Sequence, residues 1–61
     1  MHIGYRVERF LNETGMPRTK FGRLVARDPR LVDDMRNGRQ PREEMRKNIE
    51  HFMNKYREQA Q

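Results

Sequence analysis

Apolar residues recur at helical spacing from the start of the chain. Ile3, Val7, Phe10 and Leu11 stand at i, i+4, i+7 and i+8, with charged and polar residues between them. This spacing predicts one amphipathic helix. Gly15 follows, and glycine readily adopts the left-handed conformation that closes a helix. We therefore expect the first helix to end there.

A second, shorter helix is predicted over residues 17–26. Pro17 suits its opening position, because proline has no N–H to leave unpaired and its φ is already helical. The apolar side of this helix is expected to consist of Phe21, Leu24 and Val25.

A third helix is predicted from about Pro29 to Asn37. Asp28 precedes that proline, and an aspartate can cap the free N–H groups of a first turn. Gly38 is expected to end the helix. Its apolar side is supplied by Leu31, Val32 and Met35.

The fourth predicted helix is the longest, covering about residues 41–58. Pro41 opens it, and Glu43 and Glu44 fall in the first turn, where the helix dipole favours acids. The end of the chain, residues 57–61, is expected to fray. The apolar stripe of this helix consists of Met45, Ile49, Phe52, Met53 and Tyr56.

These patterns predict an all-α fold, a compact four-helix domain that covers residues 1–61 as a single unit. No segment alternates as a strand would. The second and third helices are each too short to be stable alone, and only a few residues connect them. Residues 17–38 therefore have the arrangement typical of a helix-turn-helix.

Composition narrows the class of protein. A chain of 61 residues with 33% hydrophobic and 38% charged residues builds one thin core, too little for a pocket that would bind a small-molecule effector. It has no cysteine, as suits a reducing compartment. Neither an apolar leader nor a run of membrane-spanning length is found. We expect a soluble, cytoplasmic protein with no membrane partner.

The chain offers little for catalysis or metal binding. It has neither serine nor cysteine, and Thr14 and Thr19 have no base nearby in the sequence to activate them. His2 and His51 are far apart in the sequence, with no spaced carboxylates to complete a metal site. We expect surface histidines, no enzyme activity, no metal and no other cofactor.

Positive charge is concentrated in the middle of the chain. Residues 15–42 hold eight basic residues and three acids, which accounts for the whole net charge of +5, while the six basic and six acidic residues outside this window cancel. Arginine outnumbers lysine eleven to three. Arginine suits bidentate contacts to phosphate and guanine, although a GC-rich genome produces the same bias.

Residues 15–41 also combine apolar spacing with small residues at fixed places. Gly22 stands where two helices would touch, and Asn37 with Gly38 closes the third helix. The apolar positions are Phe21, Val25, Val32 and Met35. In these features the segment resembles the core of lambda-repressor/Cro-type helix-turn-helix proteins. It departs from them at Pro17 (usually a hydroxyl cap), at Arg18 (often glutamine) and in the turn at Ala26 and Arg27 (often glycine).

The resemblance implies that the second helix lies across the DNA backbone while the third enters the major groove. Phosphate contacts are expected at both ends of this unit, from Arg18, Thr19, Lys20, Arg36, Asn37, Arg39 and Gln40. Base contacts are expected from Pro29, Arg30, Leu31, Asp33 and Asp34.

Several of these residues have a second interpretation. Arg30 can pair with guanine, or it can form an ion pair with Asp33 or Asp34 on its own helix. The two aspartates can accept from cytosine N4, but solvation or pairing with an arginine (Arg27, Arg30 or Arg36) is the favoured interpretation. Leu31 suits a thymine methyl group and the core equally well. The cluster Arg36, Asn37, Arg39 and Gln40 can also be a simple solvated surface.

The function that follows is sequence-specific binding of double-stranded DNA, by a bacterial or phage transcriptional regulator. A repressor is favoured, because so short a chain can occlude a promoter without further machinery. The alternatives are a nonspecific DNA- or RNA-binding protein of nucleoid type, and a protein-interaction or antitoxin-like module with an acidic target.

A homodimer is expected, because one such domain reads only a few base pairs. The far end of the fourth helix extends beyond the expected core, so its apolar residues are assigned to the interface: Ile49, Met53 and Tyr56. A two-fold dimer would require an inverted-repeat operator. The alternatives are a dimer that assembles only on DNA and a monomer whose fourth helix covers its own core.

Overall fold

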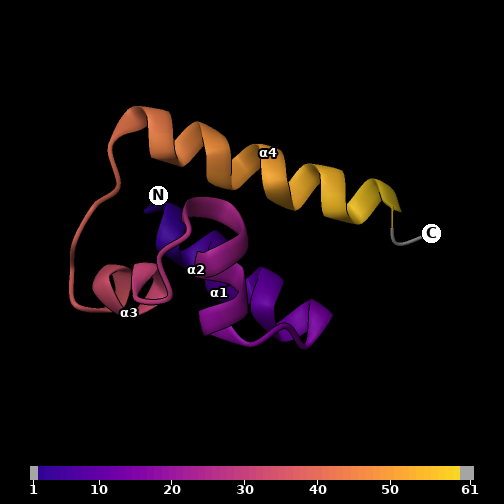
Figure 1. Ribbon diagram of the computed structural model, residues 1–61, viewed down its shortest axis with the longest axis horizontal. Coiled ribbons are helices and arrows are strands. Elements are labelled where there is room, and N and C mark those ends of the chain that lie inside the picture. Colours follow the sequence, from indigo (N-terminus) through magenta and orange to yellow (C-terminus); the bar gives the residue numbers. More distant parts are fainter. Residues whose placement is uncertain (1, 60–61) are drawn as a thin grey trace.

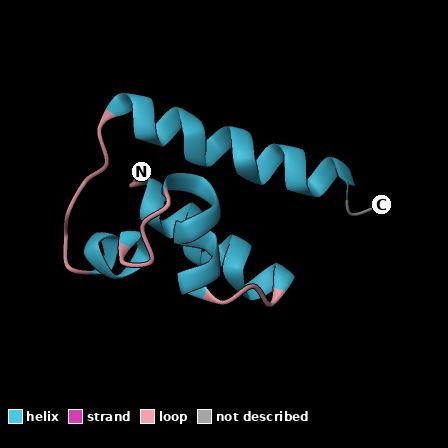
Figure 2. Cartoon of the chain, viewed as in Figure 1, coloured by secondary structure: helices cyan, strands magenta, loops and turns pink. Residues whose placement is uncertain are grey.

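Four α-helices make up the regular structure of the chain in the computed structural model, which describes residues 2–59. They are α1 (Ile3–Thr14), α2 (Arg18–Ala26), α3 (Leu31–Arg36) and α4 (Glu43–Gln59). α1 and α2 lie between α4 on one side and α3 on the other (Figure 1). The longest loop in the described part joins α3 to α4 (Figure 2). The predicted all-α class with four helices is confirmed.

A side-chain cap begins α1, and a left-handed glycine ends it. The Gly4 N–H donates to His2 Nδ1 at 2.9 Å, which caps the first turn. Gly15 adopts a left-handed conformation with φ of 71°, and its N–H donates to the Leu11 carbonyl. The predicted end at Gly15 is confirmed.

The second helix begins one residue later than predicted. Pro17 is extended, with φ −62° and ψ 141°, and no side chain caps the helix that follows. At the other end Arg27 is left-handed, with φ of 56°. Arg27 therefore takes the conformation that glycine adopts at lower cost.

The third helix is shorter than predicted and begins at Leu31. Asp28 caps a turn instead of a helix, because its Oδ1 accepts from the Arg30 N–H at 3.0 Å. The Asp28 carbonyl accepts from the Leu31 N–H at 3.2 Å. Pro29 and Arg30 therefore stand in this turn, ahead of the six-residue helix. Asn37 and Gly38, whose φ is 96°, end it as expected.

The fourth helix begins at Glu43, two residues beyond Pro41, with Glu43 and Glu44 in its first turn. Residues 57–59 were expected to fray, but the helix continues to Gln59. The rest of that prediction, for residues 60–61, lies outside the described residues. Arg57 is held by two contacts. It forms an ion pair with Glu13 at 3.6 Å and lies 5.6 Å above the Phe10 ring centroid.

Aromatic contacts join three of the helices in one core. Phe10 of α1 lies 5.6 Å from Phe21 of α2, and Phe21 lies 5.4 Å from Phe52 of α4, measured between ring centroids. The Phe21–Phe52 pair is edge-to-face, a geometry that is favourable beyond the area it buries. The buried residues are Ile3, Val7, Phe10, Leu11, Met16, Phe21, Leu31, Val32, Met35, Ile49 and Met53.

Three side chains are not where the sequence predicted them, because the helices bury other residues than expected. Leu24 was placed on the apolar side of α2 but is 54% exposed, because α2 packs through Phe21 and Gly22 instead. Ile49 and Met53 were assigned to a dimer interface but are 0% and 1% exposed. The chain's own helices cover these two side chains, so a second copy cannot contact them.

The packing of α2 against α3 depends on the missing side chain of Gly22. A Cβ at this position would collide with the Asp28 carbonyl oxygen and would lie 3.2 Å from Leu31 Cβ. The Gly22 carbonyl also accepts from the Asp28 N–H at 3.2 Å. Backbone therefore meets backbone here, at the small-residue position that the sequence predicted.

Gly22→Ala should destabilise the fold, because the added methyl group meets a backbone carbonyl that cannot move aside. Overpacking of this kind costs about 1–3 kcal/mol, and each kcal/mol lowers the melting temperature of so small a domain by about 4–8 °C. Thermal melts followed by circular dichroism measure the shift. Lys20→Ala, at an exposed position of the same helix, is the control. Equal melts for the two variants would contradict the tight contact.

Met53→Ala should also destabilise the isolated chain, by about 2–5 kcal/mol for a buried methionine. Lys55→Ala, exposed on the same helix, should leave the melt nearly unchanged. If Met53 instead joined two chains, its replacement would abolish a concentration dependence of the melt and leave the dilute protein as stable as before.

Candidate nucleic-acid interface

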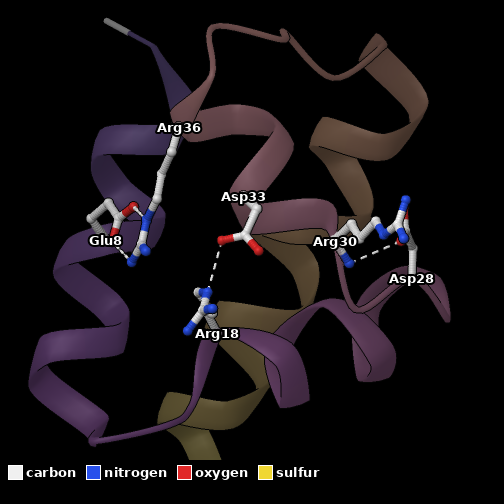
Figure 3. Close-up of polar contacts among 6 residues, drawn as sticks. All are labelled: Glu8, Arg18, Asp28, Arg30, Asp33 and Arg36. Carbon is white, nitrogen blue, oxygen red and sulfur yellow. Dashed lines mark hydrogen bonds and ion pairs between the residues drawn. The ribbon is translucent and has the colours of Figure 1, made fainter.

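An ion pair connects the start of α2 with the middle of α3. Arg18 Nε donates to Asp33 Oδ1 at 2.7 Å (Figure 3). The tight crossing of the two helices brings these residues together, although fifteen positions separate them in the sequence. Both side chains are partly exposed, so a phosphate could still reach Arg18.

A second ion pair attaches the end of α3 to α1. Arg36 donates from Nε to Glu8 Oε2 at 2.6 Å and from Nη2 to Glu8 Oε1 at 2.9 Å (Figure 3). These hydrogen bonds lower the pKa of Glu8 below its usual 4.5, against a smaller opposing effect of partial burial. The same hydrogen bonds raise the pKa of Arg36. The bidentate geometry fixes the plane of the guanidinium as well as its charge.

A third ion pair lies where α3 enters the loop. Arg39 Nη1 donates to Asp34 Oδ2 at 3.2 Å, and the Arg39 backbone N–H donates to the Asp34 carbonyl at 3.0 Å. Arg39 remains largely exposed. Its guanidinium is held beside the third helix while the rest of the loop continues to α4.

Of the predicted base-contact residues, Pro29 and Arg30 are exposed and lie in the turn before α3. Arg30 does not pair with Asp33 or Asp34, which bind Arg18 and Arg39 instead of the arginines expected. Leu31 is 8% exposed and packs in the core. It is therefore not available for a thymine methyl group.

The predicted phosphate-contact residues divide into paired and unpaired groups. Arg18, Arg36 and Arg39 are each bound to a carboxylate of the same chain. Within residues 2–59, no ion pair or side-chain hydrogen bond involves the remaining four, which are Thr19, Lys20, Asn37 and Gln40. Thr19 is partly buried, and the other three are exposed.

Two unpaired arginines on α2 and its C-cap are missing from the predicted contact residues. Arg23 and Arg27 are exposed and make no ion pair among the described residues. The spacing of Arg23 from Lys20, at i+3, would have shown that these two lie on one side of α2. Arg27 follows as the C-cap of that helix.

Beside α3, an open groove runs under the loop to α4. Apolar and charged residues both line it, among them Leu31, Met35, Met45, Asp34 and Arg42. Within residues 2–59, no group of three or more His, Asp or Glu side chains is placed to hold a metal ion. In the same part of the chain, no helix has both the length and the apolar character needed to cross a membrane.

Comparison of the chain with protein-family models, with curated proteins and with solved structures gives no match. The geometry of the candidate interface and its charges therefore have to carry any functional conclusion.

The ion pair of Glu8 makes stability depend on pH. Because the pKa of Glu8 is lower in the folded chain than in the unfolded chain, its contribution is present above the unfolded value and is lost as the pH falls through the folded value. Glu8→Gln should therefore lower the melting temperature at neutral pH, and the difference from the parent should shrink below about pH 4.5. Melts across this range measure it.

Glu58→Gln is the matched control, since it removes an exposed glutamate that makes no ion pair among the described residues. A pH-independent difference between Glu8→Gln and the parent would mean that Arg36 does not stabilise the Glu8 carboxylate.

Proposed function

We propose that the chain is a sequence-specific double-stranded DNA-binding protein of the lambda-repressor/Cro-like helix-turn-helix type. The observation that carries this proposal is the crossing of α2 and α3 at Gly22, with no room for a side chain between them. Two short helices so joined form a rigid unit, as the presentation of α3 to a major groove would need.

The position of Arg30 supports the same proposal. Arg30 is exposed in the turn just before α3, and its backbone N–H is held by Asp28. The backbone is therefore fixed while the guanidinium has no ion-pair partner within residues 2–59. An arginine held in this way at the start of a recognition helix suits a bidentate contact with guanine O6 and N7.

The ion pairs favour specific over nonspecific binding. Nonspecific affinity comes from unpaired cations that displace counterions from phosphates. Arg18, Arg36 and Arg39 are already neutralised by carboxylates, so each must exchange a partner before it gains a phosphate. Asp33 and Asp34 also place negative charge beside the proposed DNA, which penalises any site that offers them no donor.

Regulation by occlusion remains the mode of action that we propose, so the protein would act as a repressor. A single α3 contacts too few base pairs for a unique genomic site, which favours two copies on an inverted repeat. Ile49 and Met53 have no part in such a pair, because they lie in the core. Tyr56 is partly buried against Phe10, 5.4 Å between ring centroids.

Selection from a pool of random duplexes tests the proposal. The protein should enrich a short motif, and Arg30→Ala should cost about 1–3 kcal/mol on that motif and relax the preference at one base pair. Arg46→Ala, an exposed arginine on α4, is the control. Equal losses on motif and scrambled duplex would make Arg30 a phosphate contact, and the absence of any enriched motif would refute sequence-specific binding.

A further inference from the structure

One side of α2 carries basic residues around an exposed leucine. Lys20, Arg23, Leu24 and Arg27 stand at i, i+3, i+4 and i+7, so they lie on one side of the helix and its C-cap. All four are exposed. We call these four residues the α2 outer stripe. The buried residues of α2 point the other way, toward the core and α3.

The positive charge of the α2 outer stripe is not compensated. α2 itself contains no acidic residue. None of the three basic residues of the stripe takes part in an ion pair among residues 2–59, whereas Arg6 and Arg9 of α1 and Arg57 of α4 each pair with a glutamate. The stripe therefore attracts an anionic partner more strongly than the pre-paired residues around α3 do.

Leu24 decides which kind of anionic partner fits. It is 54% exposed, and Tyr5 on α1 is the other large hydrophobic residue exposed in the described part. A phosphate backbone gains nothing from a leucine at the centre of its contact surface. An amphipathic protein segment gains from both features, because it brings an apolar side chain flanked by carboxylates.

We propose that the α2 outer stripe docks an acidic amphipathic segment of a partner protein. An apolar side chain of the segment packs on Leu24, while its carboxylates meet the basic residues around it. This surface goes beyond the proposed DNA-binding function, because it faces away from α3 and leaves Arg30 free. The stripe spans only about 10 Å along the helix, so the complex is small and transient.

The test uses two fluorescent synthetic helical peptides of identical composition in an anisotropy titration. One carries its leucines on a single face between glutamates, and the other distributes them around the helix. Only the first should bind well. Leu24→Gln and Arg23→Gln should each weaken its binding, by up to about tenfold. Tyr5→Gln and Arg46→Gln are the matched controls and should bind as the parent does.

Circular dichroism of each variant checks that the fold is retained, and binding of scrambled duplex DNA is measured in parallel. The proposal is overturned if both peptides bind equally, or if Leu24→Gln leaves peptide binding unchanged. It is also overturned if Leu24→Gln weakens duplex binding, or abolishes self-association of the chain, since either result assigns the stripe to another partner. Peptide binding is independent of whether random duplexes yield a motif, so the two proposals fail separately.

Discussion

The contact between Gly22 and the Asp28 carbonyl is the constraint on which the rest of the structure depends. It brings the backbones of α2 and the following turn together, with a hydrogen bond of 3.2 Å between the Asp28 N–H and the Gly22 carbonyl. Arg27 must be left-handed for the chain to turn so sharply, and a non-glycine residue in that conformation carries a strain of about 1 kcal/mol or more. The close packing that follows offsets this cost.

The position of α3 follows from this contact. Once the turn is closed, Leu31 enters the core and Asp33 comes within 2.7 Å of Arg18. A helix of six residues is too short to be stable alone. The core holds it from one side, and ion pairs with α1 and α2 fix its outer side. Exposed ion pairs add little stability, so their main effect here is on charge and orientation.

Hydrophobic spacing predicted the number and order of the helices because each has an apolar side that its own chain covers. The same spacing could not say which residues at the margin of that side are covered. Leu24 and Met53 illustrate this in opposite directions, since one was expected inside and is exposed, and the other was expected at a partner surface and is buried. Covering depends on the angle and distance at which the helices pack, which hydrophobic spacing along one helix does not specify.

The partners in the ion pairs could not be predicted from the sequence either. Local spacing made arginines near the aspartates the natural candidates, but Asp33 pairs with Arg18, fifteen residues away, and Arg36 with Glu8, twenty-eight residues away. Such pairs form because folding brings their helices together. The sequence predicted a helix start at Asp28 and Pro29, where the structure has a turn and the helix begins only at Leu31, since a capped turn and a capped helix begin with the same residues.

In the proposed DNA complex, the pairing of Arg18 with Asp33 couples backbone contact to base contact. A phosphate at the start of α2 competes with Asp33 for the same guanidinium, so one ion pair is exchanged for another and the net electrostatic gain is small. The released Asp33 carboxylate then lies beside the groove without its partner. A DNA site with a cytosine N4 amino group at this place offers the Asp33 carboxylate a hydrogen-bond donor. At any other site the carboxylate lies close to the DNA with no donor to bind. The acid therefore converts a contact that carries no sequence information into one whose free energy depends on the base.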